Sequence, residues 1–447
     1  MSAPATFDLW SPATDTLAWE EMQERQLVAL RETFDRLRRH EVWRRRLGST
    51  GSPTSMAELA DVAYTTKSDL RAAQEETTSE RPLGAFQLVD TEQLRQITTS
   101  SGTTGAPVMF GLTTRDAQSW RSAIANAYRT AGVGPGETVA LTTGMAIVAG
   151  GLPYADGIRE AGGALAWIGG QTSSRMAGGM ARTRATVLVA TASFAAHFAQ
   201  RCAVELGRDA SELAVRTVIA GGEPGAGVPH IRRAILDAWG AQRVSELMGL
   251  GDVLPAMWAE CHVGNGMHFT AAPDILVELV EPDSGRPVPW EPGATGEAIY
   301  TTVSRESCAV VRFRSRDQLA VIARECACGR TSPTVRCVGR TDDMLIYKAM
   351  NVYPTAIRDV VLKVAGSHLT GNMRVRKDSE GQVRFDDPLP LEVELAGPAD
   401  DVRTGAALAA AEEAVRQQLR VRVSIEPQPG GVLPVSDYKN SLTYVRT

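Results

Sequence analysis

The strongest constraint on the fold comes from the middle of the chain, where short apolar runs alternate with longer stretches of helical character. Strand-like runs separated by helices are typical of a layered α/β architecture, because each helix returns the chain to the next strand of one sheet. We therefore expect an α/β fold with a multi-layer domain. The apolar runs are residues 139–141, 164–168, 186–190 and 217–220.

The regions before and after this one have other patterns. Residues 17–47 place apolar side chains at near-helical spacing with charges between them, which predicts one or two amphipathic helices packed on a larger body. Residues 275–280 alternate, Asp283-Ser284-Gly285 supplies a turn, and 297–302 form another strand. These hairpin signals predict a β-rich subdomain.

After Gly339 the chain has strand, helix and strand units that end with an alanine-rich helix over 406–419 and a strand over 420–426. This pattern is compatible with a small α+β domain. A length of 447 residues alone would suggest about three domains. We place the main boundary near Arg340.

Charge and composition exclude several kinds of partner. The net charge is −5 and the arginines are mostly dispersed among acids, so there is no basic footprint for nucleic acid. The chain has no long apolar run and its N-terminus is acidic, which argues against a membrane span and a signal peptide and favours the cytoplasm. Six cysteines are too few for a disulfide framework in so long a chain.

Residues 98–107 read Thr-Thr-Ser-Ser-Gly-Thr-Thr-Gly-Ala-Pro. Glycine lets the backbone approach a charged ligand, and successive amides and hydroxyls can donate hydrogen bonds to phosphate oxygens. The segment therefore predicts polyphosphate binding, with an ordinary polar loop as the alternative. It is not the common phosphate loop that ends in Gly-Lys-Ser/Thr, because no lysine follows Gly105.

A second group of residues has the composition of a metal site. Cys261 and His268 are followed at a distance by Cys326 and Cys328 in Cys-Ala-Cys-Gly. Three thiolates and an imidazole form a closed tetrahedral set suited to structural zinc. His262 could replace His268, and buried free thiols are the alternative to a metal site. The remaining cysteines, Cys202, Cys308 and Cys337, are interpreted as core thiols.

The order of residues 100–107 resembles the phosphate-binding signature of the adenylate-forming superfamily, the acyl-CoA synthetases and their relatives. The segment 339–346 with 351–354 is similar to the hinge and following loop of phenylacetate-CoA ligase-like members. The resemblance covers most of the chain, from about Lys67 to Lys439. Further matching segments are 131–136, 150–152, 220–224, 312–314 with Asp317, and 326–331.

This resemblance implies two unequal domains, a large adenylation domain over 1–339 and a mobile lid over 340–447. It implies that Lys439 is the catalytic lysine and that Asp342 is the hinge. In the second face of the lid, at Lys348-Ala349-Met350-Asn351, relatives commonly have Arg-Gly-x-Asn, so the pantetheine channel is expected to be tighter here.

The resemblance also implies the nucleotide site. Gly221, Gly222, Glu223 and Pro224 match the segment that lies against adenine, and Asp317 matches the acid that accepts both ribose hydroxyls. Met248, Gly249 and Asp252 fall where relatives have Tyr-Gly and a magnesium-binding Glu, and Arg316 replaces a glycine. The residues expected to hold ATP are Ser100, Ser101, Gly102, Thr103, Thr104, Gly105, Gly221, Gly222, Glu223, Pro224, Met248, Gly249, Asp317 and Arg340, with Asp252 as the Mg²⁺ ligand.

The implied activity is ATP-dependent adenylation of an aromatic carboxylic acid of the benzoate, aminobenzoate, hydroxybenzoate or phenylacetate class, followed by acyl transfer to CoA. Transfer to a small-molecule amine or hydroxyl, and a non-catalytic nucleotide-binding relative, are the alternatives. A homodimer is left open. The expected acid pocket consists of Met145, Ala146, Gly150, Gly151, Tyr154 and Leu250, for which core packing is an equal explanation.

Overall fold

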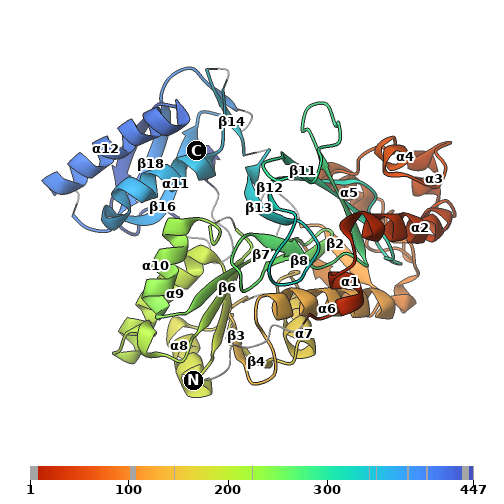
Figure 1. Cartoon of the computed structure of the whole chain (residues 1–447), viewed down its shortest axis with the longest axis horizontal. Coiled ribbons are helices and arrows are strands. Elements are labelled where there is room, and N and C mark those ends of the chain that lie inside the picture. The colour runs from red at the N-terminus through yellow and green to blue at the C-terminus, as the bar shows by residue number, and fades with distance from the viewer. Residues whose placement is uncertain are drawn as a thin grey trace.

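The computed structural model describes residues 9–100, 107–144, 146–223, 225–341, 343–348, 350–379, 382–398, 401–434 and 442–445. Its largest feature is a sheet of 11 strands in the order β10-β11-β12-β13-β9-β8-β7-β6-β5-β3-β4 (Figure 1). The α/β class expected from the sequence is confirmed. The sheet has a parallel part and an antiparallel part, which meet at β7.

The parallel part lies between two layers of helices. In β5, Val187 and Val189 face a core shared with α6 and α7, whereas Leu188 and Ala190 face a core shared with α8, α9 and α10. Burial on both faces explains why these strands read as continuous apolar runs. The elements are α6 (Thr114–Thr130), β3 (Thr138–Leu141), α7 (Leu152–Glu160), β4 (Ala164–Trp167), α8 (Ser173–Thr183), β5 (Val187–Ala190), α9 (Ala192–Leu206), η2 (Ala210–Glu212), β6 (Thr217–Gly221), α10 (Pro229–Trp239) and β7 (Arg243–Leu250).

The hairpin-rich region forms strands as expected, but it continues the same sheet instead of forming a separate one. Antiparallel pairing of β7 with β8 joins the two parts. Residues 275–280 are buried along their whole length, and α2 packs against β10. The strands are β8 (Leu254–Glu260), β9 (Met267–Phe269), β10 (Ile275–Val280), β11 (Thr295–Thr302), β12 (Phe313–Ala323) and β13 (Thr334–Arg340).

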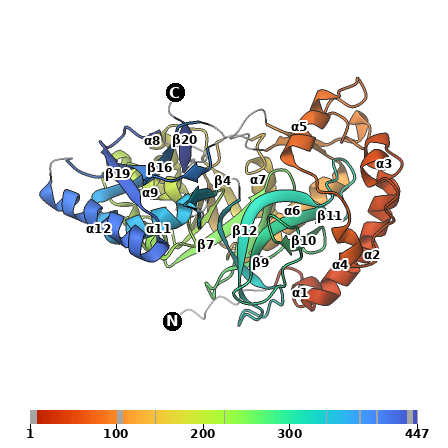
Figure 2. The same cartoon turned by 90° about the horizontal axis from the view of Figure 1, so that it is seen from above.

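The N-terminal helices cover this antiparallel part and lie at the end of the molecule opposite α11 and α12 (Figure 2). The predicted amphipathic region forms two helices, with Leu30, Phe34 and Trp43 in the core. A short hairpin follows. The elements are α1 (Pro12–Asp15), α2 (Trp19–Leu37), α3 (Glu41–Leu47), α4 (Met56–Ala60), α5 (Lys67–Glu75), η1 (Thr91–Gln93), β1 (Gln96–Thr99) and β2 (Met109–Leu112).

The C-terminal part has its own core of buried residues between Leu345 and Val423, with Ile231 of α10 at its edge. Two small sheets, β15-β14-β17 and β19-β18-β16-β20, pack with two helices. The elements are β14 (Leu345–Tyr347), β15 (Met350–Val352), α11 (Pro354–Ala365), η3 (Gly366–His368), β16 (Leu369–Lys377), β17 (Arg384–Phe385), β18 (Leu389–Leu395), α12 (Val402–Leu419), β19 (Val423–Gln428) and β20 (Thr443–Val445).

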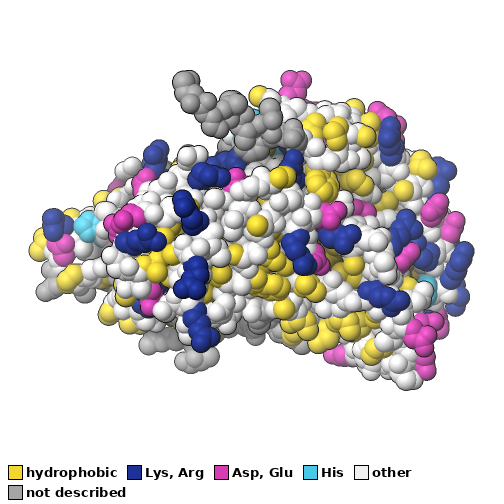
Figure 3. Space-filling model, turned by 90° about the horizontal axis from the view of Figure 1, so that it is seen from below, with side chains coloured by type: hydrophobic (Ala, Val, Ile, Leu, Met, Phe, Trp, Pro, Cys, Tyr) yellow, Lys and Arg dark blue, Asp and Glu magenta, His cyan; other side chains and the backbone are white. Residues whose placement is uncertain are grey.

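The surface carries mixed charge. On the face drawn in Figure 3, basic and acidic side chains are interspersed and apolar side chains gather near the middle. Within the described ranges, no helix combines the length and apolar character that crossing a membrane requires.

Candidate functional site

The phosphate end of the candidate site begins where β1 ends. Ser100 is buried, its amide donates to the Val108 carbonyl at 2.9 Å, and its Oγ accepts from the Val108 amide at 3.1 Å. These bonds fix the base of the loop that joins β1 to β2. The loop residues Ser101, Gly102, Thr103, Thr104 and Gly105 lie outside the described residues.

Lys67 points to the base of this loop, a placement that the sequence did not predict. Its Nζ donates to Ser100 Oγ at 2.7 Å and forms an ion pair with Asp252. Thr66 caps α5 in a capping box with Asp69, and Thr65 pairs with Phe313 of β12. Nothing in the local sequence indicates where the ammonium group lies.

The surroundings of Lys67 are cationic. Burial lowers the pKa of Lys67, the nearby Asp252 carboxylate opposes this shift, and Arg71 and Arg340 lower the pKa further. Cations contributed by α5 and β13 therefore lie near one carboxylate. Such a cluster attracts a polyanion.

Asp252 lies in the turn between β7 and β8 and is buried. The Arg305 guanidinium donates to the backbone carbonyls of Asp252 and Val253, which fixes the turn. A Cβ at Gly251 would lie 3.0 Å from Ser100 Cα, so the turn and the phosphate loop can approach closely only with glycine. The Asp252 carboxylate offers a hard oxygen ligand of the kind that Mg²⁺ prefers.

Asp317 and Arg340 lie opposite each other on β12 and β13. Arg340 Nη1 is 3.1 Å from Asp317 Oδ1. A bulge between β11 and β12 surrounds Asp317, and the Ser315 hydroxyl accepts from its amide at 3.0 Å. Bulges commonly re-aim a side chain next to an active site.

Arg316 occupies the position at which the resemblance to the superfamily implies a glycine. Its φ is +68°, a left-handed conformation that glycine adopts readily and arginine does not. The Arg316 carbonyl accepts from the Thr341 amide at 2.7 Å, and its amide donates to Glu297 Oε1 at 3.2 Å. The backbone thus keeps the conformation of a glycine despite the substitution.

The segment expected to face adenine follows β6. A Cβ at Gly221 would lie 2.6 Å from the Leu247 carbonyl, and Gly222 has φ +86°. Glu223 Oε1 accepts from the Ser193 amide at 2.6 Å in the first turn of α9. On the neighbouring strand, Met248 is half-buried and a Cβ at Gly249 would overlap the Pro255 backbone. Pro224 lies outside the described residues.

A buried acidic network lies next to this segment, and no sequence pattern predicted it. The Glu246 carboxylate lies so close to Gly227 that a Cβ there would be 2.6 Å from Glu246 Oε2. Glu260 accepts from the Glu246 amide at 3.1 Å and pairs with Arg232, and Arg336 donates to the Gly227 carbonyl. Burial, and secondarily the Glu260 charge, raises the pKa of Glu246 to about 7.

The expected acid-pocket residues lie next to the phosphate end. The Ala149 amide donates to the Thr99 carbonyl at 3.0 Å, which joins this segment to β1. The Tyr154 hydroxyl donates to the Pro255 carbonyl at 2.8 Å, and Gly150 lies near its ring. Ala146 is exposed, Gly150, Tyr154 and Leu250 are half-buried, Gly151 is buried, and Met145 lies outside the described residues.

Two residues expected in the lid, Asp342 and Lys439, lie outside the described residues. Lys348 is exposed and has φ +47°. The C-terminal part touches the large sheet through the Thr355 hydroxyl, which donates to the Val338 carbonyl at 3.1 Å, and through Tyr353, which packs against Gly339.

The structure brings Cys261, His268, Cys326 and Cys328 together, with their ligand atoms all within 4.8 Å of one another. Cys261 and His268 lie on either side of the turn between β8 and β9, and the other two lie in the turn between β12 and β13. The Sγ atoms of Cys261 and Cys326 are 3.7 Å apart, and Cys328 Sγ is 3.3 Å from His268 Nε2. His262 is not part of this group.

The chemistry of these four groups fits a thiolate-bound metal ion. Hydrogen bonds from Cys261 and, secondarily, from His268 lower the pKa of Cys328 well below its usual range. His268 Nδ1 is 3.2 Å from the Ser332 carbonyl, so donation there turns the Nε2 lone pair toward the cysteines. Buried Cys202 and Cys308 and half-buried Cys337 lie elsewhere.

Comparison with known proteins identifies relatives along most of the chain. The chain is 28% identical over 392 residues to phenylacetate-coenzyme A ligase of Escherichia coli (strain K12), covering 85% of this chain and 84% of that protein. It is also 28% identical over 398 residues to the phenylacetate-coenzyme A ligase of Thermus thermophilus, covering 87% and 85%.

Solved structures of 2-hydroxyisobutyryl-CoA ligase are similar over 100% of this chain and 94% of theirs. The complex with 2-HIB-AMP in the postadenylation state has a TM-score of 0.86 at 25% identity. The complex with 2-HIB-AMP and CoA in the thioesterification state has a TM-score of 0.70 at 26% identity. Residues 43–302 match the family model described as AMP-binding enzyme, and the chain therefore belongs to the AMP-binding enzyme family.

Proposed function

We propose that the protein activates an aromatic carboxylic acid with ATP, forming an acyl adenylate and pyrophosphate, and then transfers the acyl group to CoA. The observation that carries this proposal is the meeting of Ser100, Lys67 and Asp252 at the base of a Ser/Thr/Gly loop. Membership of the AMP-binding enzyme family and the two phenylacetate-coenzyme A ligases among the relatives support it.

In the first step the substrate carboxylate attacks the α-phosphorus of ATP, the bond between the α-phosphorus and the α,β-bridging oxygen breaks, and pyrophosphate leaves. Negative charge concentrates at the phosphates, so oriented donors and cations must meet there. Lys67, Ser100 and the loop 101–105 bind the β- and γ-phosphates. Asp317 accepts the ribose hydroxyls beside Arg340, and the segment 221–224 lies against adenine.

Asp252 would hold Mg²⁺ together with the phosphates. The ion, when bound, neutralises phosphate charge and assists departure of pyrophosphate. In the structure the Asp252 carboxylate pairs with Lys67. When this carboxylate also holds Mg²⁺, the Lys67 ammonium group would turn to a phosphate. The turn held by Arg305 keeps the carboxylate in place through this exchange.

Lys439 supplies a further cation at the α-phosphate and the attacking carboxylate, and residues 340–447 deliver it by turning about Asp342. The difference in TM-score between the postadenylation and thioesterification complexes supports an arrangement close to the former. Replacing Lys439 by Ala should lower pyrophosphate exchange by a factor on the order of 10² or more, with thermal unfolding unchanged. Exchange at the parental rate would contradict this assignment.

In the second step the CoA thiol attacks the acyl carbonyl, its proton leaves, and AMP departs. The lid face at Lys348 would line the thiol channel after rotation of the lid. The half-buried surface around Gly150 and Tyr154 would hold the aromatic ring of the acid. The ring needs no charged partner, and only the carboxylate of the acid does. The four-ligand cluster would hold zinc as a structural ion, away from this chemistry.

The test is pyrophosphate exchange with a panel of benzoates, aminobenzoates, hydroxybenzoates and phenylacetate. Acid-dependent incorporation of labelled pyrophosphate into ATP is expected with at least one acid. CoA, or an amine, is then added and the product is identified by mass. Silence with every acid would refute adenylation, and an amide in place of a thioester would refute CoA as the acceptor.

A further inference from the structure

Arg330 is a buried cation beside the cysteine cluster. It follows the Cys-Ala-Cys-Gly turn, is 3% exposed, and its Nη1 lies 3.9 Å from Cys328 Sγ. Gly329 has φ +86°, which turns the chain so that Arg330 lies over the preceding cysteine. The guanidinium group therefore approaches the sulfur ligands from the protein interior.

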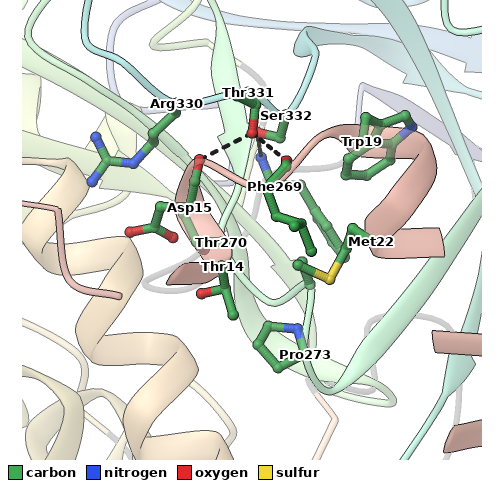
Figure 4. A pocket seen from close by; sticks show the side chains of 12 residues that line it. Thr14, Asp15, Trp19, Met22, Phe269, Thr270, Pro273, Arg330, Thr331 and Ser332 are labelled. Atoms are coloured by element: carbon green, nitrogen blue, oxygen red, sulfur yellow. Dashed lines mark hydrogen bonds between the residues drawn. The ribbon is translucent and has the colours of Figure 1, made fainter. Parts of the chain in front are cut away.

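The other nitrogens of this guanidinium lack a partner. Buried Nε and Nη2 of Arg330 form no hydrogen bond with any described residue. Figure 4 shows Arg330 and Asp15 on the same side of a small pocket. The Asp15 carboxylate is instead occupied by the Ser11 amide at 3.1 Å and by Asn126 Nδ2 at 2.9 Å.

A buried charge without a counter-charge is strongly destabilising. The thiols of the cluster can supply the missing charge. Three thiolates and a neutral imidazole around a divalent ion carry a net charge of −1, which one guanidinium neutralises. We propose that Arg330 is the counter-ion of a Cys₃His zinc centre and a positioning residue for it. This inference rests on the zinc ion proposed above and is independent of the adenylation site.

The two residues after Arg330, Thr331 and Ser332, hold the neighbouring chain and the histidine of the cluster in place. The Thr331 amide donates to the Asp15 carbonyl at 3.1 Å, and its hydroxyl donates to the Leu17 carbonyl. Ser332 meets His268 Nδ1 through its carbonyl at 3.2 Å. The segment thus ties the start of α2, the histidine ligand and the guanidinium group to one short turn.

The experiment measures zinc affinity in purified full-length protein by competition with a chromophoric chelator, after metal content per chain has been determined. Arg330→Met removes the charge, and Arg330→Lys keeps it. Arg324→Met is the matched control, since Arg324 lies two residues before Cys326 and pairs with Glu20 at the surface. We expect Arg330→Met to weaken zinc binding by about 10- to 100-fold, Arg330→Lys much less, and the control not at all.

Cobalt-substituted protein gives a second readout. The thiolate-to-cobalt absorption of Arg330→Lys should match the parent, which shows that the ligand set is intact. Equal zinc affinity in Arg330→Met and the parent, or equal losses in the Met and Lys variants, would overturn the proposal. If Arg330→Met does not fold, Arg330→Gln takes its place in the same comparison. A parent protein that binds no zinc also overturns it, and pyrophosphate exchange in that same protein shows separately whether adenylation holds.

Discussion

The turn at Asp252 and the cysteine cluster are the two places where we propose that a cation binds, and they differ in almost every physical respect. Asp252 offers one hard carboxylate that is shared with a lysine. The cluster offers four ligand atoms within 4.8 Å, three of them sulfur. An incomplete oxygen site suits an ion that arrives with its nucleotide, whereas a complete sulfur-rich site suits an ion that stays.

The same strands connect the two places. Asp252 precedes β8 and Cys261 follows it, while Asp317 lies within β12 and Cys326 follows that strand. Strand β8 has 7 residues, which span roughly 23 Å at the usual rise per residue. The cluster thus lies beyond one end of β8, and Asp252 lies beyond the other.

The largest expected effect comes from Asp252→Asn. The amide keeps an oxygen for Lys67 but loses the charge that a divalent ion requires, so we expect pyrophosphate exchange to fall by a factor on the order of 10². Metal analysis should find the same zinc content as in the parent. Pyrophosphate exchange at the rate of the parent, or a loss of zinc together with exchange, would contradict the idea that the two places hold different cations.

Lys67→Met should have the next largest effect. It removes an ammonium that touches Ser100 and Asp252, and we expect KM for ATP to rise by about 10-fold with KM for the acid unchanged. Lys67→Arg, which keeps the charge, should recover part of the loss. An unchanged KM for ATP in the Met variant would show that Lys67 only stabilises the fold.

Cys328→Ser tests the cysteine cluster in the same way. We expect loss of bound zinc and a Tm lower by several degrees, because a ligand that binds the folded state stabilises it. Exchange per folded molecule, measured well below the new Tm, should stay within about 3-fold of the parent, since the cluster does not touch the nucleotide residues. A fall as large as that of Asp252→Asn would place the cluster in the chemistry.

Glu246→Gln should have the smallest effect on exchange, and its consequence should appear in the pH dependence of stability. Burial raises the pKa of Glu246 from 4.5 to about 7 in the folded protein, so the folded state binds a proton more tightly than the unfolded state. Its contribution to stability is present below pH 4.5 and is lost as pH rises through 7. The Gln variant should lack this slope, and at pH 8 it should gain at most about 3 kcal/mol in unfolding free energy. Parallel stability curves for the two proteins would exclude this titration.

Sequence patterns predicted the elements better than their assembly. Apolar runs marked β3, β4, β5 and β6 because burial on both faces leaves a continuous apolar signal. No local pattern indicated that the hairpins of β10 and β11 would extend the same sheet, because strand order depends on long-range pairing. The cysteine cluster was predictable because ligand identity and spacing are themselves the signal.

Sequence patterns indicated the parts of the candidate site that consist of neighbouring residues. They did not indicate the parts that distant segments bring together. The loop after β1 was indicated by its own residues, and Asp317 was implied by the resemblance to the adenylate-forming superfamily. Lys67 and Glu246 reach the site from distant segments, and their side chains lie there because Thr65 pairs with β12 and because Gly227 leaves room for a carboxylate. Arg316 shows the reverse case, in which a residue that departs from the motif keeps the backbone shape of glycine.

The position of Lys67 has a practical consequence for where the working unit of this protein begins. A shortened chain that started after α5 would still contain every strand of the 11-stranded sheet. It would nevertheless lack the ammonium group at the base of the phosphate loop and the Thr65 pairing that sets it there. Any attempt to find a minimal active version, or to attach a reporter near the N-terminus, must leave this helix and its anchor in place.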